Sequence, residues 1–235
     1  MRAETVIELN DGLAKYVRDV LRLSAGHSII VFNGDGNDYP GELIDVQKKS
    51  VRLRLQQPQP TDTESPLHLQ LLQPLCAVDK FDLCLQKATE LGVTQITPFI
   101  SSRVNVTLPA SRLEKKMAHW QGIIESACEQ SGRAKLPQLE QPLLFQQALG
   151  NCPAENIKLI ASPTAKQAYS VTAAATRISC LIGPEGGFSE DEVALAELNG
   201  FQSIRMGPRI LRLETAVISL LSLVQAKHGD LDSNI

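Results

Sequence analysis

Two glycine-containing loops near the end of the chain hold the residues best suited to bind a ligand. Residues 183–187 read Gly-Pro-Glu-Gly-Gly, and residues 206–213 read Met-Gly-Pro-Arg-Ile-Leu-Arg-Leu. Each loop follows a short apolar run that predicts a buried strand, at residues 178–182 and 201–206, and each leads into a predicted helix. In α/β proteins, loops at the carboxyl ends of the strands form the cleft for nucleotide-like ligands. The two loops therefore favour an enzyme with a small organic cofactor.

The first loop combines glycine with negative charge. Ser189 and Glu192 have the spacing of a capping box, which predicts that a helix begins directly after the glycines. Two interpretations stay open: the loop binds the polar part of a cofactor through backbone amides, or it is only a tight turn. The acidic run at residues 190–192 disfavours a bound phosphate, and the sequence has no Gly-Lys-Ser/Thr phosphate loop. A dinucleotide or nucleoside triphosphate is therefore a poor candidate ligand.

The second loop is basic, with Arg205, Arg209 and Arg212 close together. They form either a solvated rim or an anionic substrate site, and their position beside a Gly-Pro turn favours the second. The helix predicted over residues 216–226 is apolar around most of its circumference. Such a helix must be buried on nearly all sides, which predicts contact with a partner subunit as well as with its own domain.

Composition excludes several classes of protein. The 235-residue chain has a net charge of −3 and only 4% aromatic residues, which argues against a globally basic nucleic-acid binder. Its five cysteines lack a C-x-x-C pattern and its four histidines show no ligand spacing, so neither disulfides nor a metal site is expected. We see no secretory signal and no apolar run of bilayer length, so a cytoplasmic protein without a membrane partner is expected.

The chain is predicted to form two domains, residues 1–66 and 67–235. The first reads as a small β-barrel or curled sheet, with a helix over 13–21 and strands over 28–32, 39–46 and 51–55. Residues 58–66 contain three prolines and no apolar residue, which is typical of a linker. The second domain alternates strands (67–72, 93–99, 157–161, 178–182, 201–206) with helices (80–91, 111–130, 144–149, about 190–200, 216–226). This alternation predicts an α/β fold with a mostly parallel sheet covered on both faces.

Basic residues in both domains are candidates for a track that follows an RNA backbone. The residues that we expect to contact RNA are Arg18, Arg22, Lys80, Lys87, Arg103 and Arg133. Most of them read equally well as ordinary charges on the surface of a helix.

Five motifs occur in an order that resembles one family. They are Gln86–Val93, Ile96–Pro98, Ala127–Arg133, Ile182–Gly187 and Gly207–Thr215. Together they resemble the 16S rRNA (uracil(1498)-N(3))-methyltransferase family of the SPOUT class. The resemblance implies an N-terminal PUA-like β-barrel that binds RNA and a C-terminal α/β domain tied in a trefoil knot. It also implies a homodimer that uses S-adenosyl-L-methionine to methylate N3 of one uridine in the 16S rRNA of the 30S ribosomal subunit.

The resemblance also implies roles for individual residues. The cofactor would be bound by Ala161, Ser162, Ile182, Gly183, Gly186, Met206, Gly207, Ile210, Leu211 and Leu213. The apolar members of this set suit an adenine, and the uncharged glycine loop suits a ligand without phosphates. Arg209 or Arg212 is the candidate cation beside the uracil oxygens. Glu185 or Glu214 is the candidate proton acceptor or the group that orients those arginines.

Two other functions compete with this interpretation. One is an RNA-binding or ribosome-assembly factor that has lost catalysis, against which the intact cofactor loops argue. The other is a nicotinamide-dependent dehydrogenase, but the sequence lacks the G-x-G-x-x-G fingerprint and its acidic ribose partner.

Overall fold

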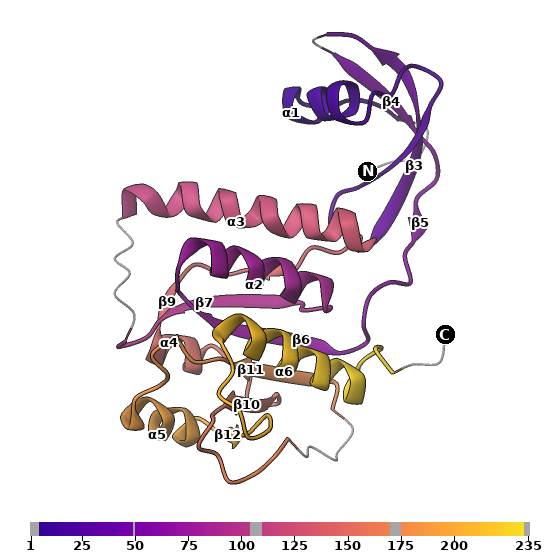
Figure 1. The fold of residues 1–235 in the computed structure, drawn as a ribbon. Helices are drawn as coiled ribbons and strands as arrows, with labels where there is room; N and C mark the ends of the chain where they lie inside the picture. Colours follow the sequence, from indigo (N-terminus) through magenta and orange to yellow (C-terminus); the bar gives the residue numbers. More distant parts are fainter. Residues whose placement is uncertain (1–4, 49, 104–109, 170–174, 233–235) are drawn as a thin grey trace. The chain divides into compact units, whose positions relative to one another are not determined.

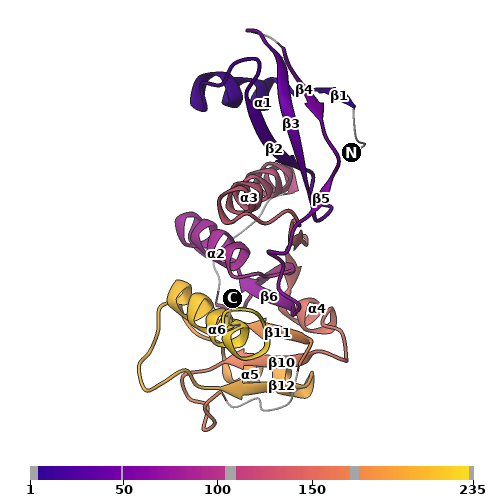
Figure 2. The same cartoon turned by 90° about the vertical axis from the view of Figure 1, so that its right-hand side faces the viewer.

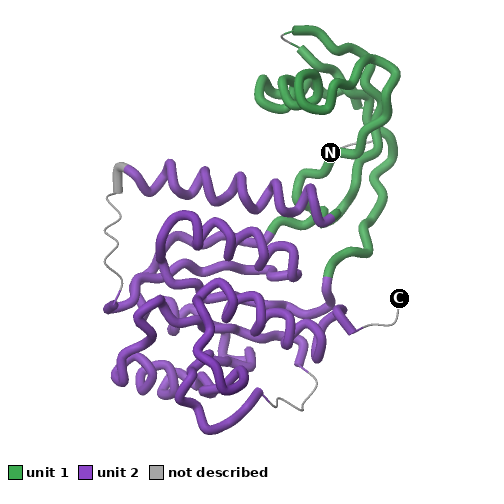
Figure 3. The backbone as a smooth tube through the Cα atoms, in the orientation of Figure 1, with its two compact units in different colours: residues 1–64, 132–136 green, residues 65–131, 137–235 purple. Residues whose placement is uncertain are grey.

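The structure is a computed structural model that describes residues 5–48, 50–103, 110–169 and 175–232 (Figure 1). The chain forms two compact units (Figure 3). Unit 1 comprises Met1–Glu64 and Gly132–Leu136, and unit 2 comprises Ser65–Ser131 and Pro137–Ile235. The sequence predicts one division after residue 66, whereas in the structure the chain also returns to unit 1 at residues 132–136. Each unit is described by itself.

Unit 1 is an antiparallel sheet with a short helical segment, as predicted. The strands are β1 (Val6–Glu8), β4 (Val51–Leu55), β3 (Asn37–Val46) and β2 (Ser28–Phe32) in spatial order, with β5 (Gln59–Pro60) paired to β3. Helix α1 (Asp11–Lys15) continues into the π-helical turn η1 (Tyr16–Val20). Along β4, Val51, Leu53 and Leu55 are at most 1% exposed, whereas Arg52 and Arg54 face solvent. The strict alternation of this strand therefore places its apolar residues in the core and its arginines on the solvent face, as predicted.

The segment 132–136 is held in unit 1 by specific contacts. Gly36 N donates to Ala134 O at 3.1 Å, and Thr63 Oγ1 donates to Gly132 O at 2.9 Å. Arg133 Nη2 lies 2.8 Å from a carboxylate oxygen of Glu64. Residues 59–60, predicted as linker, form the edge strand β5 instead. An edge position tolerates Pro60 because a proline has no N–H to give to the ladder.

Unit 2 is built on a parallel sheet, as the sequence predicts. In spatial order its strands are β12 (Phe201–Ile204), β10 (Ile157–Ala161), β11 (Arg177–Leu181), β6 (His68–Pro74), β7 (Gln95–Ile100) and β8 (Gln138–Leu139), with β9 (Leu143–Leu144) also paired to β7. Every pairing among these strands is parallel. The central strands β6, β11 and β10 lie side by side in Figure 2. The very short strands β8 and β9 are not predicted because two residues carry no periodic signal.

Helices cover both faces of the sheet. They are α2 (Val78–Glu90), α3 (Ala110–Ser131), α4 (Phe145–Gly150), α5 (Glu190–Leu198) and α6 (Leu213–His228). Figure 1 shows α2 between α3 and α6. Residues of α4 and α5 pack against the strands on the opposite face of the sheet, where they form one core cluster. Helix α2 ends as predicted, because Gly92 adopts φ +74° just beyond it. None of the helices within the described ranges has the length and apolar character that crossing a bilayer requires.

Candidate active site

Three neighbouring strands end at one edge of the unit 2 sheet. Strand β10 lies between β11 and β12, with Ile160 opposite Leu181 and Ala161 opposite Ile204. Because all three strands run in the same direction, the loops that follow them emerge together. The two glycine loops and the loop after Ala161 are therefore adjacent, which is the arrangement expected at a ligand site of a parallel sheet.

These loops enclose a cavity of about 990 Å³. Its lining includes all ten residues predicted to bind the cofactor: Ala161, Ser162, Ile182, Gly183, Gly186, Met206, Gly207, Ile210, Leu211 and Leu213. It also includes the four predicted catalytic residues Glu185, Arg209, Arg212 and Glu214. Two of the six predicted RNA contacts, Lys80 and Arg103, lie on its wall. The structure thus brings residues from five separate chain segments to one place.

The first glycine loop is a tight turn packed on an aromatic cluster. Gly187 N donates to Pro184 O at 2.8 Å, and Gly187 adopts φ +68°, a conformation that favours glycine. Phe188, the next residue, packs near the rings of Phe99 and Phe145, with centroid distances of 6.5 and 5.7 Å. A Cβ on Gly183 would lie only 3.1 Å from the Phe188 ring. The loop is therefore shaped both by backbone conformation and by its fit to Phe188.

Two side chains from elsewhere in unit 2 hold this loop. Lys80 Nζ, from the first turns of α2, forms an ion pair with the Glu185 carboxylate. Arg103 Nη1, which follows β7, donates to the carbonyl oxygen of Gly186 at 2.8 Å. Neither contact uses a backbone N–H group of the loop. The loop is thereby fixed before any ligand arrives, which lowers the entropic cost of binding.

Glu192 connects the same region to the end of β7. As predicted, it forms a capping box with Ser189, whose hydroxyl accepts from Glu192 N at 3.1 Å. The Glu192 carboxylate also accepts from Ser101 Oγ at 2.8 Å and from Ser102 N at 2.9 Å. Burial alone would raise the pKa of Glu192, but these hydrogen bonds from backbone and hydroxyl groups lower it below its ordinary value.

Charged groups meet on one side of the cavity. The hydrogen bond and charge of Glu185 raise the pKa of Lys80; the charge of Glu214 adds to this effect. The charge of Arg212 acts in the opposite direction on Lys80, so it is also close. The Glu214 Oε2 atom is buried and accepts no hydrogen bond from the residues that the structure describes. A buried carboxylate oxygen without a donor is costly, which indicates that a ligand group completes it.

The remaining predicted RNA contacts are not in this cavity. Arg18 hydrogen-bonds to Asp19 and to the carbonyl oxygen of Lys48, and Arg22 is exposed with φ +54°. Lys87 pairs with Glu90 at 2.8 Å. Arg133 is 4% exposed and paired with Glu64, so its guanidinium is engaged within the protein. Counting charges in the sequence does not separate such a structural arginine from a ligand-binding one.

Sequence reasoning missed some residues of the cavity. Thr164 and Val193 also line it, and Thr164 Oγ1 lies 3.0 Å from Ser162 Oγ. The Ser-Pro-Thr turn after the third predicted strand is a loop signal that could have identified Thr164. Across the described ranges, no cluster of three or more His, Cys, Asp or Glu side chains is suited to a metal ion.

Comparison with known proteins extends this picture. Residues 63–225 match the RNA methyltransferase domain family, and residues 9–56 match the RNA methyltransferase PUA domain family. The ribosomal RNA small subunit methyltransferase E of Buchnera aphidicola subsp. Schizaphis graminum is 32% identical over 234 residues, which cover 98% of this chain and 94% of that protein.

Two solved structures are also close to this one. A ribosomal RNA small subunit methyltransferase E from Neisseria gonorrhoeae, bound to S-adenosyl methionine, superposes with a TM-score of 0.92 at 36% identity, covering 98% of this chain and 95% of that one. A putative methyltransferase from Legionella pneumophila, in complex with the same cofactor, gives a TM-score of 0.93 at 36% identity, covering 98% and 96%. The expected fold, an antiparallel PUA domain followed by a parallel α/β domain of the SPOUT class, is confirmed. The chain belongs to the RNA methyltransferase family that includes the ribosomal RNA small subunit methyltransferases E.

Proposed function

We propose that this protein transfers a methyl group from S-adenosyl-L-methionine to N3 of one uridine in 16S rRNA. The observation that carries the proposal is that one cavity collects both glycine loops, Arg209, Arg212 and the carboxylate of Glu214, whose Oε2 has no donor among the described residues. Family membership assigns the class of reaction, rRNA methylation. The choice of uridine N3 and of the 30S subunit as partner rests on the resemblance carried by the five ordered sequence motifs. The cytoplasm as location rests on the cysteine pattern of the sequence, which fits a reducing compartment.

The residues of the cavity fit S-adenosylmethionine. The glycine loop carries no positive charge that would select a phosphate, and Glu185 in that loop is already paired with Lys80. Ile182 and Leu213 give an apolar wall, at 1% and 5% exposure, that suits an adenine ring. We propose that these segments hold the cofactor within the knotted chain topology that is typical of the SPOUT class.

The chemistry requires control of one proton. The bound cofactor supplies an electrophilic methyl group on a sulfonium, and N3 of uracil must lose its proton as the new N–C bond forms. Glu214 is the better proton acceptor of the two candidates, because its Oε2 has no donor among the described residues whereas Glu185 is bound to Lys80. The proton from N3 would thus pass to the Glu214 carboxylate.

Loss of that proton places negative charge on the two uracil oxygens. Arg209 and Arg212 lie on the cavity wall, and neither forms an ion pair with any residue in the described ranges. A guanidinium that is free to face the base can stabilise this charge as it develops. The uridine must leave its stack to reach the cavity, as is general for enzymes that act on a base.

A homodimer is part of the proposal. Two large apolar side chains of adjacent helices remain exposed away from the cavities: Leu83 (37%) on α2 and Leu223 (43%) on α6. Helix α6 is apolar around most of its surface, so burial of its remaining face by a second copy would remove this surface from water. Sedimentation at micromolar concentration tests this part.

The experiment that tests the function uses labelled S-adenosylmethionine and 30S subunits that lack the modification. The expected product is one N3-methyluridine per particle, identified by nuclease digestion and mass spectrometry. A label on ribose, on a carbon atom or on another base would refute the proposal. Absence of any methyl transfer, together with binding of the 30S subunit, would support the catalytically inactive assembly factor instead.

A further inference from the structure

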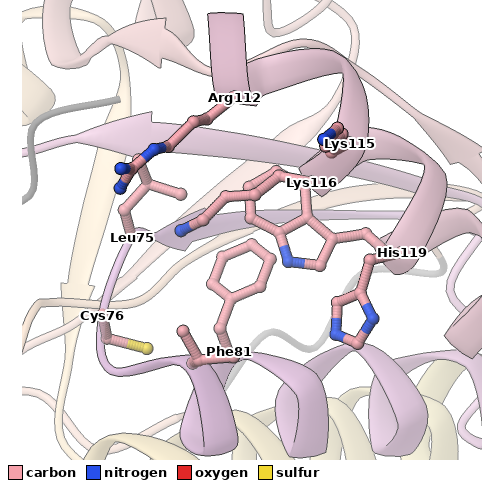
Figure 4. Close-up of a pocket in the computed structure, with 9 residues that line it drawn as sticks. Leu75, Cys76, Phe81, Arg112, Lys115, Lys116 and His119 are labelled. Atoms are coloured by element: carbon pink, nitrogen blue, oxygen red, sulfur yellow. The ribbon is translucent and has the colours of Figure 1, made fainter. Parts of the chain in front are cut away.

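A second cavity, of about 360 Å³, lies where α3 packs over the start of α2 (Figure 4). Its lining comes from the end of β6, from the first turns of α2 and from the first half of α3. The volume is within the range of pockets that hold small organic ligands, roughly 300 to 1,000 Å³. Among the described residues, none lines both this cavity and the cavity of the two glycine loops, which we call the methyl-transfer cavity.

The base of this cavity is apolar and aromatic. Phe81 and Trp120 pack together with their ring centroids 4.5 Å apart, and Leu75 completes the apolar wall. Phe81 and Trp120 are fixed in position because both are at most 2% exposed. Rings buried to this degree offer little surface for stacking, but they fix the shape of the cavity and need no ordering when a ligand enters.

The rim is positively charged. Arg112, Lys115 and Lys116 line the cavity, and none of the three forms an ion pair within the part of the chain that the structure describes. The Lys116 ammonium lies 5.7 Å from the centroid of the Trp120 ring. Among the nearby acids, Asp82 of α2 is engaged by His119 Nε2 at 2.7 Å. The charges of three others, Glu185, Asp79 and Glu214, act on Cys76. Free cations above an apolar wall favour a ligand that combines a flat ring with an anionic group.

Two of the three rim cations lie on the same side of the cavity. In Figure 4, Arg112 and Lys116 extend from α3 over the side that Leu75 and Cys76 form. Burial and, next in size, the charge of Glu185, a residue that lines the first cavity, raise the pKa of the Cys76 thiol to about 12. The junction between β6 and α2 therefore separates two neighbouring cavities.

We propose that the second cavity binds one unstacked nucleotide of the RNA strand that flanks the methylated uridine. Its base would lie against the wall formed by Leu75, Phe81 and Trp120, and Arg112 and Lys116 would bind the adjoining phosphates. This inference rests on the proposed function, because it extends the substrate strand beyond the reacting base. Single-stranded RNA is generally bound by such a pairing of apolar or aromatic surface with phosphate-binding cations.

The chain offers a direct optical probe of this site. Trp120 is its single tryptophan, so fluorescence reports on this cavity alone. Titration with a short single-stranded oligouridylate should change the emission of Trp120 and saturate. The double substitution R112Q/K116Q should weaken binding about tenfold and reduce the slope of log K against log salt by about 1.4, which is the loss expected for two phosphate contacts on single-stranded RNA. Both side chains are at the rim, so thermal unfolding should stay unchanged.

A matched control comes from α6. Lys227 is exposed and holds its ammonium 5.4 Å from the centroid of the Tyr169 ring, much as Lys116 does over Trp120. K227Q should bind oligouridylate like the wild type, whereas K116Q should bind it more weakly. Equal affinity of K116Q and the wild type would overturn the proposal. So would a change in sedimentation of R112Q/K116Q with unchanged RNA affinity, because the cavity would then belong to an interface between copies.

Methyl transfer to 30S subunits separates this inference from the proposed function. If the wild type makes N3-methyluridine and R112Q/K116Q raises KM for the 30S subunit while kcat is retained, both are supported. If the wild type methylates uridine but oligouridylate leaves Trp120 emission unchanged, the nucleotide site is refuted and the function stands. If oligouridylate binds at this site but no uridine N3 is methylated, the function fails and the nucleotide site stands.

Discussion

Arg103 donates from Nη1 to the carbonyl oxygen of Gly186 at 2.8 Å, which joins the end of β7 to the first glycine loop. The acceptor is a backbone atom in the middle of the loop, so the contact sets the loop conformation directly. Charge-assisted hydrogen bonds of this kind contribute more than neutral ones, about 1.5 to 3 kcal/mol. Arg103 therefore acts as a positioning residue for the cofactor loop.

Replacement of Arg103 by alanine should weaken S-adenosylmethionine binding about tenfold, because the free loop must be ordered when the ligand binds. Calorimetric titration measures this effect. Arg177→Ala, at the start of β11 and hence at the opposite end of the strands, is the control and should leave affinity unchanged. If R103A binds the cofactor normally and loses only RNA affinity, Arg103 is an RNA contact instead.

Glu214→Gln should lower kcat by about 10² to 10⁴, the usual contribution of a positioned proton acceptor. The Kd for the cofactor should change little, because glutamine keeps the size and a hydrogen-bond acceptor of glutamate. Single-turnover methylation at several pH values provides the check. A residual rate that rises with pH would show that hydroxide replaces the missing carboxylate. A loss of cofactor affinity equal to the loss of rate would assign Glu214 to binding alone.

Arg209→Ala should reduce turnover by about 10² to 10³, because a cation that stabilises developing charge acts mainly in the transition state. Cofactor affinity should be retained. Arg209→Lys should recover part of the rate, since it restores charge without the planar guanidinium. The same pair of substitutions at Arg212 identifies which arginine has the larger role. Equal losses of rate and cofactor affinity in R209A would contradict a role confined to the transition state.

Glu192→Gln should destabilise unit 2 by about 1 to 3 kcal/mol, because the neutral amide cannot accept all the hydrogen bonds that the carboxylate now receives. The pKa of Glu192 is lowered in the folded state, so its contribution is present above the ordinary glutamate pKa and is lost as pH falls through the folded value. The difference in urea midpoint between wild type and E192Q should therefore shrink below about pH 4.

The control for this prediction is Asp191→Asn, one residue earlier. Asp191 is exposed and lies in the same first turn of α5. The D191N substitution removes one negative charge near the start of the helix, so it should change the free energy of unfolding by no more than about 1 kcal/mol. A constant difference between E192Q and the wild type from pH 3 to pH 7 would show that ionisation of Glu192 does not contribute to stability.

Two glycines should respond to alanine with opposite signs. Gly187 adopts φ +68°, and a Cβ would find open space, so the cost of Gly187→Ala is backbone strain of about 1 kcal/mol. Gly122 lies within α3, where alanine stabilises a helix by about 1 kcal/mol. Thermal unfolding should show a lower Tm for G187A and a higher Tm for G122A. A rise in Tm for G187A would contradict the left-handed turn.

The sequence predicts local features well because their causes are local. The alternation at residues 51–55 and the capping box of Ser189 and Glu192 depend on spacing over a few positions, and both occur in the structure. The second set of hydrogen bonds of Glu192, to Ser101 and Ser102, joins distant segments, and no local pattern encodes it.

The placement of the cofactor loops and of Arg133 shows the same limit. Both glycine loops are evident from their composition, but their meeting point depends on β10 lying between β11 and β12, an order that parallel strands do not reveal in sequence. Arg133 occurs in a basic stretch, and only the three-dimensional structure reveals that it is buried and paired with Glu64. Contacts between distant segments of the chain therefore decide which of the predicted residues lie in the same site.

The return of residues 132–136 to the first unit constrains how this protein can be cut or recombined. A gene fusion that replaced only the residues before position 65 would remove Glu64, the ion-pair partner of Arg133, and the neighbouring residues of unit 1. Exchange of unit 1 between relatives would therefore have to include residues 132–136 as well as the residues before position 65. The two parts of the chain are thus expected to be inherited together.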